Sequence, residues 1–456
     1  MSTLSLPRYS ADTRPTPMYS AEPPPFEPQH LRAETPSFVA SAATARPPGG
    51  QFVKESKGGN LRLRLYRQTD NATVPVFGIR GPVEGTLQLS KPKGLVFVAV
   101  RVEGLLKVKE VAGGGTTTTV LCNETLTLWR KDSDLQPCPF SFPFSIPLPT
   151  TFSDEHGSWA LPPTYEAHLS GLPGFTANVD YSVTAITSKS KSIMLGIGVT
   201  TVSTPFIYYP RSAPARGIPP RLEPKNTSPG LYATPEWRVS ESSIASRLPG
   251  TSRGILCKFY TPASHVLCMR RAIPYHISFT GPTLALTTLI TYMPSRTGAA
   301  AVRACSRIQL IRQTTVDVKN EYAPVGATSE MWRTRSIGEG SLCRSGDGTD
   351  WLSFTGEINV DSEVTIGGFR AAGLWVKDCI VFSITPPDSH KGPIGDMRCV
   401  IPIRLVTDPA WGPGHVPSNE LVPRASPTTS EARGTSIDGA EGYDNCSSQM
   451  TFESVG

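Results

Sequence analysis

Four residues with metal-binding side chains lie between positions 257 and 276: Cys257, His265, Cys268 and His276. Thiolates and imidazole nitrogens are the ligands that structural zinc sites use. Their intervals of 8, 3 and 8 residues match no zinc motif, and on the strands expected here the four side chains need not converge. We therefore expect neither a bound metal nor a cofactor.

Motifs of catalysis are missing from the remaining residues. None of the seven histidines belongs to a His-Glu-x-x-His pattern, and no Gly-x-Ser-x-Gly occurs. The glycines at 338, 340, 346 and 348 are not followed by a phosphate-binding helix pattern, so they indicate turns. We expect a protein that is not an enzyme.

Arginines offer a different chemistry, the two-point binding of phosphate. Arg270 and Arg271 are adjacent, and Arg303 and Arg307 share the polar face of a strand expected over 302–318. Together they are candidates for binding phosphoinositide or a phosphorylated segment. The alternative is that these charges only keep the surface soluble. Arg312 belongs to the same set of candidate arginines.

Composition limits the class of protein. Of the 456 residues, 44 are Pro and 40 are Gly, 18% are charged and the net charge is +6. This mild, scattered positive charge does not predict nucleic-acid binding, although it suits an anionic membrane surface. The nine cysteines form no Cys-x-x-Cys pair and the first residues contain no apolar signal segment, which is typical of a reduced, cytoplasmic chain.

Stretches rich in proline and poor in apolar residues divide the chain. Such segments bury too little hydrophobic surface to offset the entropy of ordering. The sequence predicts, in order, a disordered tail, a first domain, a Pro-rich connection, a second domain and a disordered tail, with bounds 1–51, 52–209, 210–250, 251–407 and 408–456.

Both predicted domains consist of short apolar or alternating runs separated by turn residues, the pattern of antiparallel β-sandwiches. We expect an all-β fold of two tandem immunoglobulin-like sandwiches and no convincing amphipathic helix. The strands are expected at 83–89, 94–102, 120–130, 179–185, 193–202, 254–259, 273–280, 283–292, 302–318, 356–360, 375–384 and 399–406.

The Pro-rich stretch 137–149 cannot donate ladder hydrogen bonds at its prolines, so it should lie on a sheet edge or cross between sheets. Its aromatic residues Phe140, Phe142 and Phe144 are expected to cap the core.

Several motifs in order resemble those of fungal-type α-arrestins. Residues 77–89 are similar to the opening strand pair of that family, and 98–104 to its next core strand. The sequence Phe-Ser-Phe-Pro-Phe at 140–144, Leu-Pro-Pro-Thr-Tyr at 161–165 and Val-Asp-Tyr-Ser-Val at 179–183 resembles family motifs at the same spacing. The resemblance covers about 52–407 and is looser after 250.

The resemblance implies an arrestin-type fold and a trafficking adaptor. Such adaptors bind cytoplasmic segments of membrane transporters or receptors and recruit a HECT-type ubiquitin ligase through its WW domains. The bound transporter is then ubiquitinated and endocytosed. A cytoplasmic protein recruited to the plasma membrane or to endosomes is therefore expected.

A WW domain binds Pro-Pro-x-Tyr because consecutive prolines form an extended helix at little entropic cost. The chain has one such motif, Pro162-Pro163-Thr164-Tyr165, at a position where the resemblance implies a buried structural element. Leu6, Pro7 and Tyr9 form a Leu-Pro-x-Tyr variant in the N-terminal tail, and the C-terminal tail has no such motif. The alternative function is a β-sandwich interaction scaffold in signalling without a ubiquitin-ligase link.

Overall fold

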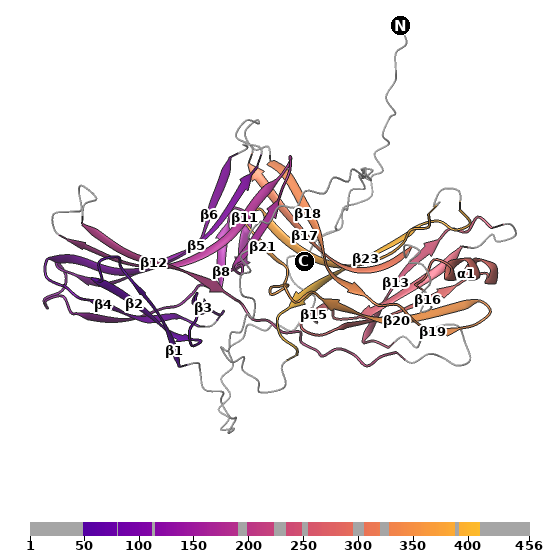
Figure 1. Ribbon diagram of the computed structural model, residues 1–456, viewed down its shortest axis with the longest axis horizontal. Helices are drawn as coiled ribbons and strands as arrows, with labels where there is room; N and C mark the ends of the chain where they lie inside the picture. The colour runs from indigo at the N-terminus through magenta and orange to yellow at the C-terminus, as the bar shows by residue number, and fades with distance from the viewer. Residues whose placement is uncertain are drawn as a thin grey trace, which may run out of the picture. The chain divides into compact units, whose positions relative to one another are not determined.

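The computed structural model describes residues 49–79, 81–111, 115–189, 198–222, 234–248, 254–294, 305–319, 328–387 and 392–410. Most of the two predicted tails lies outside these residues. The described residues are almost entirely strands, so the predicted all-β sandwich fold is confirmed (Figure 1).

The first sheet has four antiparallel strands in the order β1-β2-β4-β7. Apolar and polar residues alternate along these strands, as expected for a sheet with one buried face. In β2, Leu61, Leu63 and Leu65 face the core and are almost fully buried. β7 carries Pro143 at the sheet edge, the place expected for a residue without a backbone N–H. The bounds are β1 (Gly50–Glu55), β2 (Leu61–Gln68), β4 (Val83–Leu89) and β7 (Ser141–Ile146).

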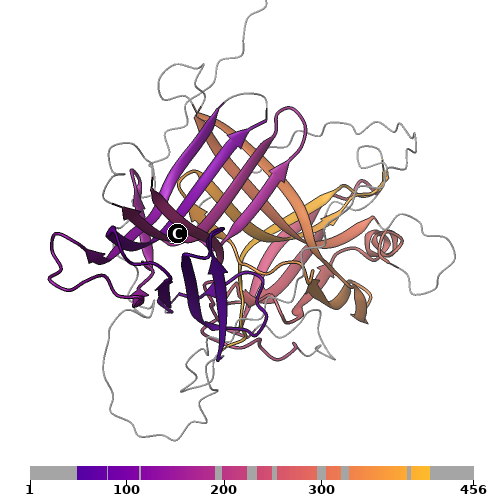
Figure 2. The ribbon, with the colours of Figure 1, turned by 60° about the vertical axis from the view of Figure 1, so that its left-hand side comes forward.

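The second sheet has six strands in the order β3-β12-β11-β5-β6, with β10 also paired to β11. Figure 2 shows its long purple and magenta strands side by side. The short pairing of β3 with β12 is parallel, and the other pairings are antiparallel. The bounds are β3 (Val76–Phe77), β5 (Leu95–Glu110), β6 (Thr116–Arg130), β10 (Tyr165–Leu169), β11 (Phe175–Lys189) and β12 (Val199–Tyr208); β8 (Thr151–Asp154) and β9 (Gly157–Ala160) form a separate hairpin.

The C-terminal half is one sheet of eleven strands that folds over onto itself. Phe259 of β14 and Phe382 of β22 are not on neighbouring strands, yet their ring centroids lie 5.7 Å apart in one buried core. The strand order is β13-β14-β16-β20-β18-β17-β22-β23-β15, with β19 beside β20 and β21 beside β22. The bounds are β13 (Trp237–Ile244), β14 (Ile255–Pro262), β15 (Val266–Cys268), β16 (Ile273–Thr280), β17 (Ser306–Lys319), β18 (Thr328–Gly340), β19 (Cys343–Asp347), β20 (Trp351–Val360), β21 (Phe369–Ala371), β22 (Leu374–Ile384) and β23 (Met397–Val406).

The strand predicted over 283–292 is wrong, because these residues form the helix α1 (Thr283–Ile290). The many threonines favour a strand, but Pro282 at the N-cap interrupts the extended run after β16. Ala285, Leu286 and Leu289 then face the core with helical spacing. The other expected strands overlap observed ones, and β13 lies inside the residues predicted as connection.

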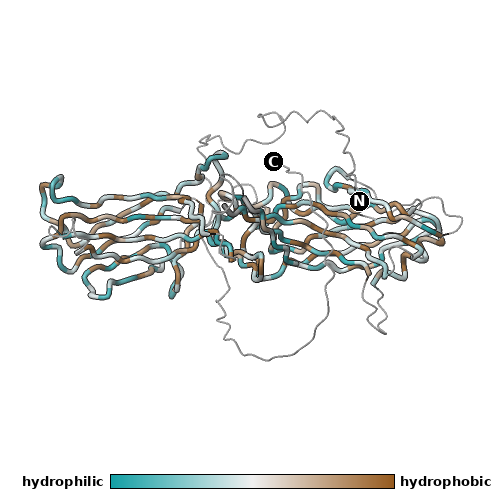
Figure 3. The backbone as a smooth tube through the Cα atoms, turned by 90° about the horizontal axis from the view of Figure 1, so that it is seen from above, coloured by the Kyte–Doolittle hydropathy of each residue, from teal (hydrophilic) through white to brown (hydrophobic). Residues whose placement is uncertain are grey.

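Hydrophobic residues recur along the strands of both halves (Figure 3). Val316, Leu374 and Val376 of the C-terminal sheet belong to the same buried core as the first two sheets. Phe142 and Phe144 are buried there as well, whereas Phe140 is 65% exposed and does not cap the core. A hydrophobic core shared between the halves therefore holds them together.

Candidate functional site

The Pro-Pro-x-Tyr motif at 162–165 lies where the two halves of the chain share a hydrophobic core. Pro162 and Pro163 are buried, and the Pro162 carbonyl accepts a hydrogen bond from the Tyr181 hydroxyl at 2.6 Å. The Thr164 amide donates a hydrogen bond to the Tyr208 carbonyl, and the Tyr208 amide donates one to the Thr164 hydroxyl. These hydrogen bonds use polar groups of the motif within the fold, so a WW domain would have to break them to bind it.

Tyr165 is half-buried between the two halves of the chain. Its hydroxyl lies 2.9 Å from the Thr314 hydroxyl of β17, and its ring meets Phe369 of β21 edge-on, with centroids 5.1 Å apart. A WW domain that took this tyrosine would have to remove it from the C-terminal sheet. Leu6, Pro7 and Tyr9 of the second candidate motif lie outside the described residues.

Arg270 and Arg271 lie in the turn between β15 and β16, and both are exposed. They line a cleft of about 430 Å³ together with Tyr209, Asn359 and the turn 361–365 that follows β20. Arg270 acts on the neighbouring Tyr209 hydroxyl and opposes the rise in its pKa that burial causes. Among the described residues, none forms a hydrogen bond or ion pair with the Arg271 guanidinium.

Two of the other candidate arginines, Arg307 and Arg312, do not line this cleft. Arg307 is exposed on β17 but does not line it, and Arg303 lies outside the described residues. Arg312 is only 8% exposed, and its Nε donates to Oδ1 of Asp378 at 2.7 Å. It occupies a position on the buried face of β17, so its inclusion in a basic surface is wrong.

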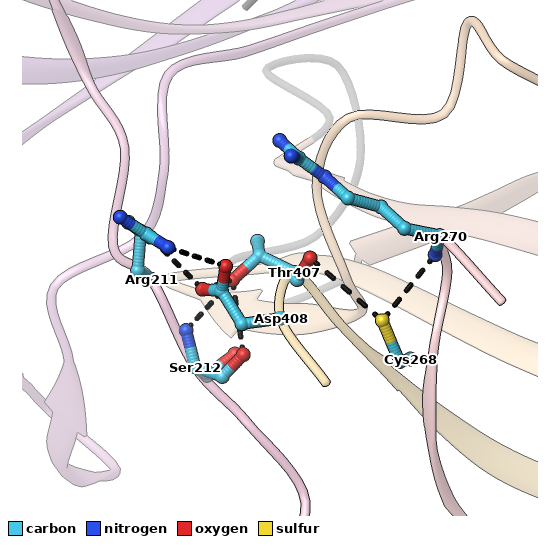
Figure 4. A network of polar contacts seen from close by, with 6 residues as sticks. All are labelled: Arg211, Ser212, Cys268, Arg270, Thr407 and Asp408. Atoms are coloured by element: carbon cyan, nitrogen blue, oxygen red, sulfur yellow. Dashed lines mark hydrogen bonds and ion pairs between the residues drawn. The ribbon is translucent and has the colours of Figure 1, made fainter. Parts of the chain in front are cut away.

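A polar cluster ties the residues after β12 to the end of β23 (Figure 4). Arg211 donates to both carboxylate oxygens of Asp408, at 2.9 and 2.6 Å. The Ser212 amide donates to the Thr407 hydroxyl at 2.8 Å, and the Asp408 amide donates to the Ser212 carbonyl at 2.9 Å. Asp408 falls in the residues predicted as a disordered tail, but here it is buried.

Burial and charge act together on the titratable groups of this region. Burial raises the pKa of Tyr209, although the charge of Arg270 opposes the effect. Burial would also raise the pKa of Asp408, but hydrogen bonds from Arg211 and Thr407 outweigh it, and that pKa is lowered. Tyr209 therefore stays a neutral hydroxyl and Asp408 a carboxylate at neutral pH.

The cleft is suited to binding an anion. It offers the Arg271 guanidinium, which has no side-chain partner among the described residues, a second guanidinium on Arg270, and polar groups of Asn359, Ser362 and Thr365. Asp361 is the one acidic residue that lines it. The adjacent arginines could be found from the sequence. Tyr209 and 359–365 could not, because they are distant in the chain and carry no motif.

Three of the four residues of the zinc candidate have other, separate environments. Cys257 is fully buried, Cys268 lies 3.9 Å from the Thr407 carbonyl oxygen, and His276 Nε2 accepts a hydrogen bond from the Leu222 amide at 3.1 Å. In the described part of the chain, no three His, Cys, Asp or Glu side chains gather as a metal site requires.

Within the same residues, no helix has the length and apolar character needed to cross a membrane. Compared with known proteins, the chain matches no protein-family model and resembles no curated protein sequence.

Proposed function

We propose that this protein is a non-catalytic, arrestin-like trafficking adaptor. It binds cytoplasmic segments of membrane transporters or receptors and recruits a WW-domain ubiquitin ligase, which leads to ubiquitination and endocytosis of the bound protein. The order of motifs at 140–183 supports the proposal, together with the all-β sandwich fold.

The observation that carries the binding part of the proposal is the cleft at Arg270 and Arg271. The Arg271 guanidinium, unpaired as far as the described residues go, and the surrounding hydrogen-bonding groups suit a phosphorylated segment of the cargo or an anionic lipid headgroup. Because both arginines are exposed, their attraction for an anion should weaken as salt rises.

Substitution of Arg271 tests this role. Arg271→Glu should abolish binding of the purified protein to a phosphorylated cargo peptide, whereas Arg307→Glu changes the net charge equally outside the cleft and should preserve most of it. Equal loss in both variants would reduce the effect to overall charge and refute the cleft as the binding site.

Ligase recruitment is tested with purified WW domains of a HECT ligase and the full-length protein. Tyr9→Ala should abolish binding. Tyr165→Phe should not, because Pro162 and Pro163 are buried and the motif around Tyr165 is not accessible to a WW domain. Circular dichroism would show that each variant is folded.

The burial of Pro162 and Pro163 favours a second function, an interaction scaffold without a ligase. Failure of the wild-type chain to bind any WW domain, with cargo binding retained, would support the scaffold.

A further inference from the structure

The segment that follows the Arg211–Asp408 pair forms neither helix nor strand and reaches the C-terminal sheet at its last described residues. It reads Ile218-Pro-Pro-Arg-Leu222. The two consecutive prolines hold this backbone extended, since each fixes its own φ and restricts the residue before it.

Three side chains of the C-terminal sheet pack against or hydrogen-bond to the segment: Trp237, Tyr260 and His276. We call them the Trp237 groove. In the sheet register, Tyr260 of β14 pairs with His276 of β16, and β13, which carries Trp237, is the next strand. The Trp237 and His276 rings meet edge-on at 4.8 Å. Neighbouring strands therefore hold the groove rigidly.

The groove makes two hydrogen bonds to the segment's backbone. The Trp237 indole N–H donates to the Pro220 carbonyl at 3.1 Å, and the Leu222 amide donates to His276 Nε2 at 3.1 Å. Burial and the charge of Arg221 lower the pKa of His276 to about 4, so its ring is neutral and accepts this bond at neutral pH.

Two side chains of the segment give the contact its selectivity. Leu222 is only 8% exposed and packs with Trp237 and Tyr260 in a small separate core. Arg221 forms an ion pair with Glu357, and its side chain remains 64% exposed. An aromatic groove with an indole donor, an apolar pocket and one acidic residue has the features with which proline-rich peptides are bound.

We propose that the Trp237 groove is a peptide-recognition site for extended Pro-Arg-Leu segments, which the chain's own residues 220–222 occupy as an internal ligand. A partner peptide of the same chemistry binds there when the internal segment leaves. This inference does not depend on the adaptor function.

The internal ligand competes at the high effective concentration of a tethered segment. Free peptide should therefore bind the wild-type chain weakly. Leu222→Ala removes the internal anchor but leaves the groove intact, so it should raise affinity for a fluorescent peptide of residues 216–224 by on the order of tenfold or more, measured by fluorescence polarisation.

Three comparisons make the test specific. Leu284→Ala, the same change at an exposed site on α1, should not raise affinity. A peptide with alanine in place of its leucine should not bind the Leu222→Ala chain. Adding Trp237→Phe to Leu222→Ala should lower peptide affinity, because the indole donor is lost.

Arg221→Glu gives a second way to open the groove. It replaces the ion pair with Glu357 by repulsion between two carboxylates, while Leu222 is unchanged. It should also increase binding of the free peptide. The proposal is overturned if both opened variants remain folded by near-ultraviolet circular dichroism but bind no more peptide than wild type, or if the Trp237→Phe change leaves peptide affinity unchanged.

Discussion

Arg211 and Asp408 are 197 positions apart in the chain, yet they form a two-point ion pair, with donor–acceptor distances of 2.9 and 2.6 Å. The Asp408 side chain is 6% exposed and that of Arg211 is 21% exposed. The pair joins the residues that leave the second sheet to those that end the last strand, so both ends of the C-terminal half are held at one point.

Loss of this carboxylate should destabilise the fold. Asp408→Asn keeps the side-chain volume but removes the negative charge that attracts the Arg211 guanidinium, and we expect the free energy of unfolding to fall by about 2–3 kcal/mol at pH 7. Urea denaturation measures the change. Glu363→Gln, which breaks the exposed pair with Arg335, should cost at most about 1 kcal/mol and is the control.

The same pair predicts a pH dependence. Since the pKa of Asp408 is lowered in the folded chain, its contribution is present above the ordinary carboxyl pKa and is lost as pH falls through the lowered value. The stability difference between wild type and Asp408→Asn should therefore shrink in acid. A constant difference down to the acid limit of folding would contradict this account.

The hydroxyls of Tyr165 and Thr314 should be energetically coupled across the joint. Tyr165→Phe removes one hydrogen bond at 2.9 Å and should cost about 1 kcal/mol. A double-mutant cycle with Thr314→Val isolates the pair, because the second change should cost less once the first is made. Strict additivity would mean that the bond contributes nothing.

Arg312 and Asp378 form the most buried ion pair of the described residues, with side chains 10% and 0% exposed. Asp378→Ala leaves a buried cation and should cost about 3–5 kcal/mol. The apolar pair Arg312→Met with Asp378→Leu should recover most of that loss, since no unpaired charge remains. Thermal unfolding of the wild type and the two variants compares them; a double variant less stable than Asp378→Ala would contradict the prediction.

Gly104 is required by the packing around it. A Cβ atom there would lie 2.5 Å from the Tyr181 ring and 2.9 Å from Cys122 Sγ, both in the buried core. Gly104→Ala should destabilise the protein by about 1–3 kcal/mol through overpacking. At Gly217 nothing lies within 4 Å, so Gly217→Ala should change stability by less than about 0.5 kcal/mol, and denaturant midpoints report both.

His276 should make the protein less stable as pH falls below about 6.5. Its pKa drops from 6.5 to about 4 on folding, so the unfolded chain takes up a proton first. The stabilisation is complete above 6.5 and disappears as pH falls towards 4. His276→Gln should lose this part of the pH dependence in denaturation series; the exposed His156→Gln is the control.

Local pattern was enough to locate strands whose faces differ clearly in polarity. The predicted bounds 83–89 and 273–280 are those of β4 and β16. It failed at α1, where the threonines have strand propensity but a buried stripe of Ala285, Leu286 and Leu289 favours the helix. Intrinsic propensity influences the conformation of a segment less than the burial of its apolar side chains does, and that burial depends on the neighbouring strands.

Sequence alone determined the all-β class and the adjacency of Arg270 and Arg271. Both can be recognised within a few consecutive residues, the first from the alternation of apolar and polar residues and the second from neighbouring positions in the chain. Only the tertiary structure decided that Arg312 is buried against Asp378 and that Tyr165 is held against Thr314. It also decided that Asp408 meets Arg211. Each of these pairings joins residues more than 60 positions apart, and a one-dimensional pattern carries no information on which distant strands pack together.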